Sequence, residues 1–186
     1  MKISPRTKLG LIGAGFALPI VASILAYRYL HPEASANYGE LLLPPQTITA
    51  QPMGLPGGGH FDFSGLRGRW VLTVSDSGLC LENCAEKLST MRQVRLALGR
   101  DAGRVARVFV IDDLKAPDLE ALRPFEGTIY VLTPPGMSLP SGAANDRAHI
   151  HLVDPNGNVM MRWATPVDRR SMLRDLQRLL KASQIG

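Results

Sequence analysis

An uncharged apolar run near the N-terminus restricts most strongly how this chain can fold. The run extends from Leu9 to Tyr27 and contains 19 residues without a charged side chain. About 20 such residues cross a bilayer as a helix. The run has no polar face of the kind that a surface helix of a soluble protein presents to water. We therefore predict a transmembrane anchor at residues 9–30, followed by an exported domain.

The charges beside this run predict its orientation. Lys2, Arg6 and Lys8 precede it, and residues 1–8 contain no acidic side chain. Positive flanks stay in the cytoplasm, so we expect residues 1–8 inside a bacterial inner membrane and the rest of the chain in the periplasm. A cleaved signal peptide is the alternative, because the small residues 34–36 suit a cleavage site.

The distribution of charge excludes nucleic acid as an expected partner. The net charge is +5, and residues 1–30 supply +4 of it through four bases and no acid. The other 156 residues carry 17 bases and 16 acids, a balance of +1. Binding of phosphates requires a concentrated excess of positive charge. The exported part lacks that excess.

Residues 31–60 differ in composition from the rest of the exported part. They contain five prolines and the triplet Gly57-Gly58-Gly59, which disfavour long regular structure. We predict that this segment is a tether and that the globular domain spans residues 61–186.

The domain alternates between strand and helix patterns. The sequence predicts strands at about 69–75, 105–111 and 128–133, helices at 82–98, within 116–125 and within 167–183, a loop at 134–146 and a hairpin within 148–163. Alternating strands and helices that end in a hairpin indicate an α/β fold, in which helices flank a mixed sheet.

The chain has only two cysteines, Cys80 and Cys84, and they lie between the first of these strands and the helix after it. Residues four apart share one face of a helix, and a helix N-terminus favours thiolates. The pair suits a structural disulfide, a redox couple or two ligands for a soft metal ion. A loop this short adds little stability as a crosslink, which favours a functional pair with Cys80 and Cys84 as its catalytic residues.

A few other side chains are candidates for the same site. His149 and His151 share one face of a predicted strand, and His149, beside the loop, is better placed to reach the cysteines. Asp112 ends the second predicted strand, either close to the cysteine loop or as a helix cap or turn residue. Met160 and Met161 are typical of packing rather than of metal binding.

Several features together resemble one known family. The cysteine pair at the exit of a strand, "LRGRWVL" before it, "NYGELLLPP" after the anchor and a late histidine before "DPNG" resemble the Sco (SenC) family. Membership would imply a membrane-anchored, copper-handling protein with a thioredoxin-like fold that acts in cytochrome c oxidase assembly. The resemblance implies copper as the cofactor, held by Cys80, Cys84 and His149. Asp146 stands where the family has its copper-binding histidine.

The resemblance also implies partners. They would be cytochrome c oxidase subunit II or another periplasmic thiol or copper protein, reached from a membrane anchor at residues 9–30. Two alternatives stay open. The first alternative is a thiol–disulfide oxidoreductase without a stable metal. The second is a non-catalytic assembly scaffold with a structural disulfide.

Overall fold

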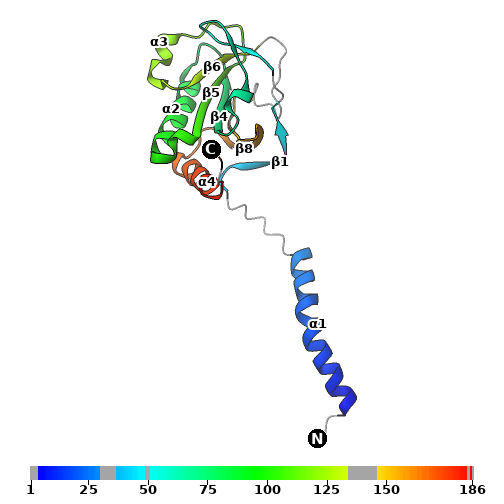
Figure 1. The fold of residues 1–186 in the computed structure, drawn as a ribbon. Helices are drawn as coiled ribbons and strands as arrows, with labels where there is room; N and C mark the ends of the chain where they lie inside the picture. Colours follow the sequence, from blue (N-terminus) through cyan, green and yellow to red (C-terminus); the bar gives the residue numbers. More distant parts are fainter. Residues whose placement is uncertain (1–3, 30–36, 49–50, 134–145, 184, 186) are drawn as a thin grey trace. The chain divides into compact units, whose positions relative to one another are not determined.

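The computed structural model describes residues 4–29, 37–48, 51–133, 146–183 and 185. It divides into two compact units, residues 1–36 and 37–186. Figure 1 shows a helix in the first unit and a sheet with helices in the second. The predicted loop at 134–146 lies outside the described residues except for Asp146.

The described part of the N-terminal unit contains one helix, α1, which spans Pro5–Tyr29. Its section Arg6–Arg28 is long and apolar enough to cross a membrane, by length and composition. Pro19 lies inside it, as membrane helices tolerate. The predicted apolar helix is therefore present.

The second unit is built on one mixed sheet. Its described strands are β1 (Glu40–Thr47), β2 (Met53–Gly54), β3 (His60–Phe61), β4 (Trp70–Asp76), β5 (Val105–Ile111), β6 (Ile129–Leu132), β7 (His149–Val153) and β8 (Asn158–Ala164). They are arranged in the order β1-β8-β7-β4-β5-β6-β2-β3. Strands β4, β5 and β6 are parallel, whereas β7 is antiparallel to β4.

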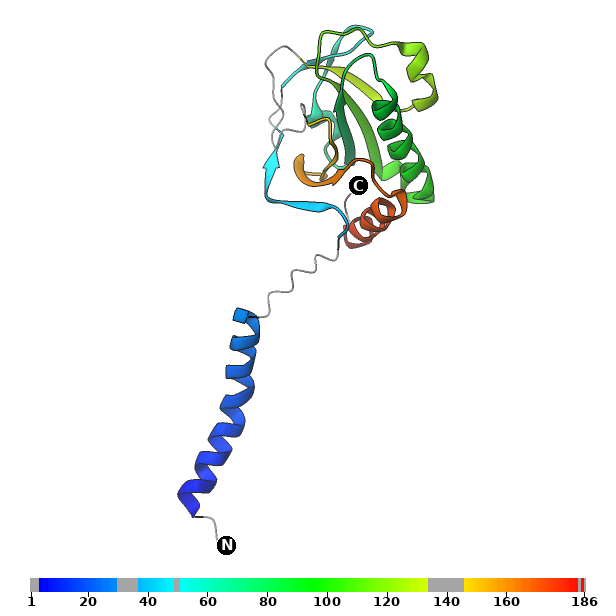
Figure 2. The same cartoon turned by 180° about the vertical axis from the view of Figure 1, so that it is seen from behind.

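The α-helices of this unit are α2 (Glu82–Ala97), α3 (Leu119–Leu122) and α4 (Arg169–Ala182). Short 3-10 turns span Phe63–Leu66, Gly99–Arg104 and Arg123–Phe125. In Figure 2, which shows the fold from behind, α2 and α4 lie against the sheet. Their apolar faces join one core cluster, and a second cluster covers the other side of the central strands. The predicted α/β architecture with a mixed sheet is confirmed.

Helical periodicity explains the two long helices of the domain. On α2 the buried residues Cys84, Leu88 and Met91 recur three and four positions apart, as one helix face requires. On α4 the buried positions Met172 and Leu176 follow the same spacing. The β4 and β5 segments are buried almost throughout, as central parallel strands covered on both faces should be.

The prediction that residues 31–60 form a tether is wrong for the described part from residue 37 onward. Strand β1 pairs with β8, and the register shifts between Leu41 and Gln46. Pro44 and Pro45 lie within that shift. A strand at the edge of a sheet tolerates prolines, because it need not donate hydrogen bonds on its open side. The globular unit therefore begins at Asn37 rather than at residue 61.

Candidate functional site

The two cysteines lie at the carboxyl end of β4, on either side of the start of α2. Cys80 and Cys84 form a disulfide with a Cα–Cα distance of 5.0 Å. The two side chains differ in access to solvent, since Cys84 is 1% exposed while Cys80 is half-buried. Cys80 also has a positive φ of 39°, which is uncommon for a residue other than glycine. A partner approaching the disulfide would therefore meet Cys80 first.

The loop that carries Cys80 is anchored to the loop after β5. The Asp113 carboxylate accepts hydrogen bonds from the backbone N–H groups of Gly78 and Lys115, each at 3.1 Å. Gly78 lies against the carbonyl oxygen of Lys115, so that a Cβ atom there would overlap it. This close packing explains why glycine occupies the position. The cysteine loop is thus held by a hydrogen bond and by close packing against the loop after β5.

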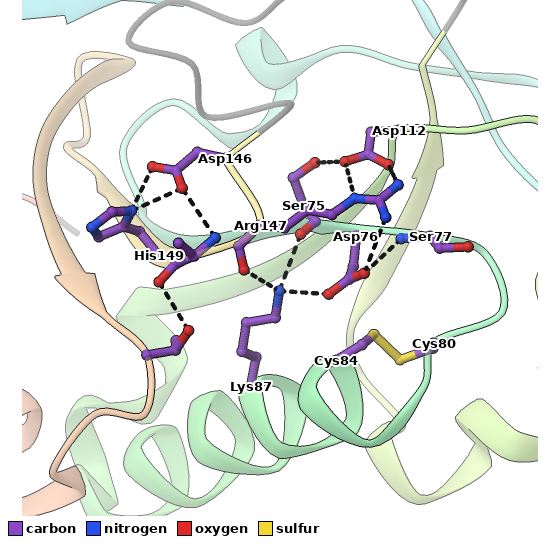
Figure 3. A network of polar contacts seen from close by, with 12 residues as sticks. Ser75, Asp76, Ser77, Cys80, Cys84, Lys87, Asp112, Asp146, Arg147 and His149 are labelled. Atoms are coloured by element: carbon purple, nitrogen blue, oxygen red, sulfur yellow. Dashed lines mark hydrogen bonds and ion pairs between the residues drawn. A yellow bond between two sulfur atoms is a disulfide. The ribbon is translucent and has the colours of Figure 1, made fainter.

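A buried lysine lies on the helix face that carries Cys84. The Lys87 side chain is 3% exposed. Its Nζ atom donates to the Ser75 carbonyl oxygen at 3.2 Å, to Asp76 Oδ2 at 2.6 Å and to the Arg147 carbonyl oxygen at 2.8 Å. These three bonds use all the hydrogens of the ammonium group. Lys87 therefore joins α2 to the end of β4 and to the segment before β7 (Figure 3).

Arg147 completes this polar network. Its guanidinium group donates to both carboxylate oxygens of Asp112, with Nε 3.0 Å from Oδ2 and Nη2 bonded to Oδ1. Ser75 Oγ donates to the same carboxylate at 2.7 Å. The hydrogen bond to Asp112 raises the pKa of Arg147. Of the two interpretations of Asp112, the structure supports the position close to the cysteine loop, because its carboxylate accepts hydrogen bonds from Ser75 and Arg147 in this network.

The two histidines share a strand face, as the alternation predicts, but they turn to Asp146. His149 Nδ1 lies 2.6 Å from Asp146 Oδ2, and His151 Nε2 lies 3.5 Å from the same oxygen. Burial lowers the pKa of His151 to about 4, against the opposing effect of Asp146. Burial would raise the pKa of Asp146, but hydrogen bonds from His149 and the Ala148 N–H outweigh it and lower that pKa.

The structure thus brings Cys80 and Cys84 together and places His149 with a carboxylate instead. In Figure 3 the disulfide and the His149 ring lie at opposite ends of the drawn network. Among the described residues, no group of three or more His, Cys, Asp or Glu side chains is arranged to hold a metal ion. The copper set of Cys80, Cys84 and His149 therefore stays a prediction.

A pocket of about 460 Å³ adjoins this network, between the first turns of α2 and the segments that flank β7 and β8. Its lining includes Asn83, Glu86, Lys87, Arg147 and Pro166. The pocket offers a partner segment both polar and apolar contacts beside the helix that carries Cys84.

Sequence reasoning missed Arg147 and the structural use of Lys87. A signal was available for the lysine, which lies three residues after Cys84 on a mostly apolar helix face. No comparable signal marks Arg147, because its acid partners are about 35 residues away or more in the sequence.

Comparisons with known proteins agree with this fold. A family model described as "Transmembrane-like, thioredoxin-like, C-terminal domain" matches residues 70–183. No curated protein matches the sequence. Copper-bound yeast Sco1 is 14% identical, with 75% of this chain and 95% of that chain covered and a TM-score of 0.61.

Two further solved structures are similar. Apo Sco1 from Thermus thermophilus is 17% identical, with 79% and 99% of the two chains covered and a TM-score of 0.62. A putative protein disulfide isomerase from Bacteroides thetaiotaomicron is 17% identical, with 73% and 89% covered and a TM-score of 0.52. At these identities the likeness establishes the fold. The predicted resemblance to Sco proteins is confirmed at that level.

Proposed function

Because the chain belongs to the family of transmembrane-like, thioredoxin-like C-terminal domains, we propose that it is a membrane-anchored, Sco-like thiol–disulfide protein. It would work in the periplasm, on the cysteines of the copper centre in cytochrome c oxidase subunit II or of a similar exported copper protein. The observation that carries this proposal is the Cys80–Cys84 disulfide at the N-terminal end of α2.

The exchange reaction uses the difference in access between the two sulfurs. In the reduced chain, the Cys80 thiolate attacks one sulfur of a partner disulfide, and the other partner sulfur leaves as a thiolate that takes up a proton. The Cys84 thiolate then attacks the Cys80 sulfur of the mixed disulfide and releases the second partner thiol. Two electrons and two protons pass to the partner, and a dithiol protein of the same compartment must reduce the chain again.

Local structure supports these two roles. The half-buried Cys80 is accessible for the first attack, whereas Cys84 is buried directly behind it in the first turn of α2. The N-terminus of a helix carries partial positive charge that stabilises a thiolate. The half-exposed guanidinium of Arg147 and the buried ammonium of Lys87 add positive charge in the same region.

Carriage of copper is the second candidate function. Once reduced, the pair offers two thiolates, which are ligands that Cu(I) favours. The fold likeness to a Sco1 structure with copper bound also favours this reading. His149 would serve as a third ligand only after it leaves Asp146, so we expect the cysteines to carry most of any copper affinity.

One experiment separates these functions. The full chain in detergent is reduced and mixed with the oxidised copper-binding domain of subunit II, and thiols are counted by mass spectrometry. We expect Cys80→Ala to abolish exchange and Cys84→Ala to trap a mixed disulfide, while Ser89→Ala on α2 serves as the control. In a parallel arm, Cu(I) is titrated into the reduced chain and into its His149→Ala variant.

Each outcome points to one function. Thiol–disulfide exchange together with weak Cu(I) binding supports the thiol–disulfide role. Tight, stoichiometric Cu(I) binding without exchange supports the role of a copper chaperone. If Cys80→Ala and Cys84→Ala both sustain oxidase assembly in cells, neither role stands and a scaffold with a structural disulfide remains. An affinity for Cu(I) that falls in His149→Ala would show that His149 reaches the cysteines.

A further inference from the structure

A largely buried ion pair joins the helix that carries Cys84 to the end of β4, and the exchange reaction described above does not use it. Lys87 is on the same face of α2 as Cys84, one turn later, and both side chains are buried. Burying an ammonium group costs free energy unless a carboxylate and further acceptors compensate it. Asp76 Oδ2, 2.6 Å from Lys87 Nζ, supplies that carboxylate.

The same carboxylate also holds the start of the cysteine loop. Asp76 is the last residue of β4, and its Oδ1 atom accepts a hydrogen bond of 2.8 Å from the backbone N–H of Ser77. Ser77 in turn accepts a 3.0 Å hydrogen bond from the Cys80 N–H through its carbonyl oxygen. One oxygen of Asp76 therefore binds the cysteine helix, and the other binds the loop that leads to Cys80. Figure 3 shows the Asp76 carboxylate between Lys87 and the backbone of Ser77.

We propose that Lys87 and Asp76 are positioning residues that set the redox equilibrium of the Cys80–Cys84 pair through their opposite charges. The inference rests on the proposed redox function. A positive charge fixed near the sulfurs stabilises thiolates, and a negative charge destabilises them. Both effects are stronger among buried groups than in water. The two side chains should therefore act in opposite directions on the reduced form.

Arg147 contacts both members of this pair. Its carbonyl oxygen is the third acceptor for Lys87, and its Nη1 atom lies 3.9 Å from Asp76 Oδ1. The Asp76 carboxylate consequently keeps one cationic neighbour when Lys87 is removed. In Asp76→Asn, the side-chain amide oxygen and the two carbonyl oxygens remain as acceptors for Lys87, but its ammonium group loses the carboxylate, so this variant should be the less stable of the two.

The test compares Lys87→Met with Asp76→Asn in the full chain in detergent. Equilibration with glutathione reports the redox equilibrium, and the ultraviolet absorbance of the thiolate against pH reports how readily the thiols ionise. In Lys87→Met we expect about a tenfold shift toward the disulfide, or about 30 mV, and an absorbance midpoint at higher pH. In Asp76→Asn we expect both changes with the opposite sign. Lys181→Met, an exposed lysine on α4, is the matched control.

The double variant Lys87→Met/Asp76→Asn removes the pair without leaving a buried charge, and it should return both readings close to those of the unchanged protein. A purely structural role would move both single variants in the same direction. That result, or shifts no larger than those of the Lys181→Met control, overturns the proposal. These measurements need no protein partner, so a failure of the proposed exchange with subunit II would not affect them. Should Lys87→Met not fold, Asp76→Asn and the double variant still decide the sign.

Discussion

The imidazole of His151 illustrates what burial does to a single residue in this domain. The side chain is fully buried on β7, and both ring nitrogens lack a hydrogen-bond partner among the described residues. Burial lowers its pKa to about 4, so the ring is neutral at physiological pH. Alternation along the strand predicts that His151 shares a face with His149, but it cannot predict that both rings face Asp146.

This burial makes the stability of the domain depend on pH. An unfolded histidine has a pKa of about 6.5, so between that pH and about 4 the unfolded chain binds a proton that the folded chain does not. The free energy of unfolding should therefore fall as the pH decreases through this range, by up to about 3 kcal/mol. Urea unfolding of the full chain in detergent at a series of pH values measures this dependence.

The variant His151→Leu should lose most of this dependence, whereas His60→Leu, at an exposed position on β3, should retain it. Equal acid sensitivity in His151→Leu and in the unchanged protein would contradict the assignment to His151.

At the scale of elements, β1 shows where local sequence rules fail. Its prolines predict a tether, yet the segment pairs with β8 at the edge of the sheet. A buried carboxylate on α4 holds its start, since Asp175 accepts hydrogen bonds from the backbone N–H groups of Tyr38 and Gly39 and from Trp163 Nε1, at 2.8–3.1 Å. Gly39 is required there because a Cβ atom would lie 2.6 Å from Trp163 Nε1.

Asp175→Asn should destabilise the pairing of β1 with the sheet more than it destabilises the central strands. An amide keeps one acceptor oxygen but loses the charge that strengthens these bonds, and bonds to charged groups contribute about 1.5–3 kcal/mol. We expect faster amide hydrogen exchange in β1, with little change in the central strands β4 and β5. Glu40→Gln, which alters an exposed ion pair with Arg162, should have a much smaller effect. Uniform acceleration over the whole sheet would instead show that Asp175 stabilises the fold globally.

At the scale of the whole molecule, strand direction assembles the candidate site. The parallel strands β4 and β5 end at the same edge of the sheet, and the antiparallel β7 begins there. Asp76, Asp112 and Arg147 therefore meet beside the cysteine loop although they are far apart in the sequence. Functional sites of open α/β sheets lie at such carboxyl edges.

The anchor and the positive charges before it predict that the domain lies in the periplasm. A protease added to spheroplasts should remove the domain from the membrane, whereas intact cells should protect it, because the outer membrane excludes the enzyme. A C-terminal epitope tag followed by immunoblotting measures this, with a cytoplasmic protein as the control for lysis. If the domain stays resistant to the protease until the inner membrane is broken, the predicted topology is wrong.

The sequence by itself determined the apolar N-terminal helix, the order of most strands and helices from residue 69 on and the proximity of the two cysteines. These features depend on hydrophobic periodicity and on short spacings, which a chain expresses locally. Only the tertiary structure decided that β1 joins the sheet, that His149 faces Asp146 and that Lys87, Asp76 and Arg147 form one polar network at the end of β4. Each of these depends on contacts between distant segments, whose partners are chosen by burial and by pairing of buried charges and not by local pattern.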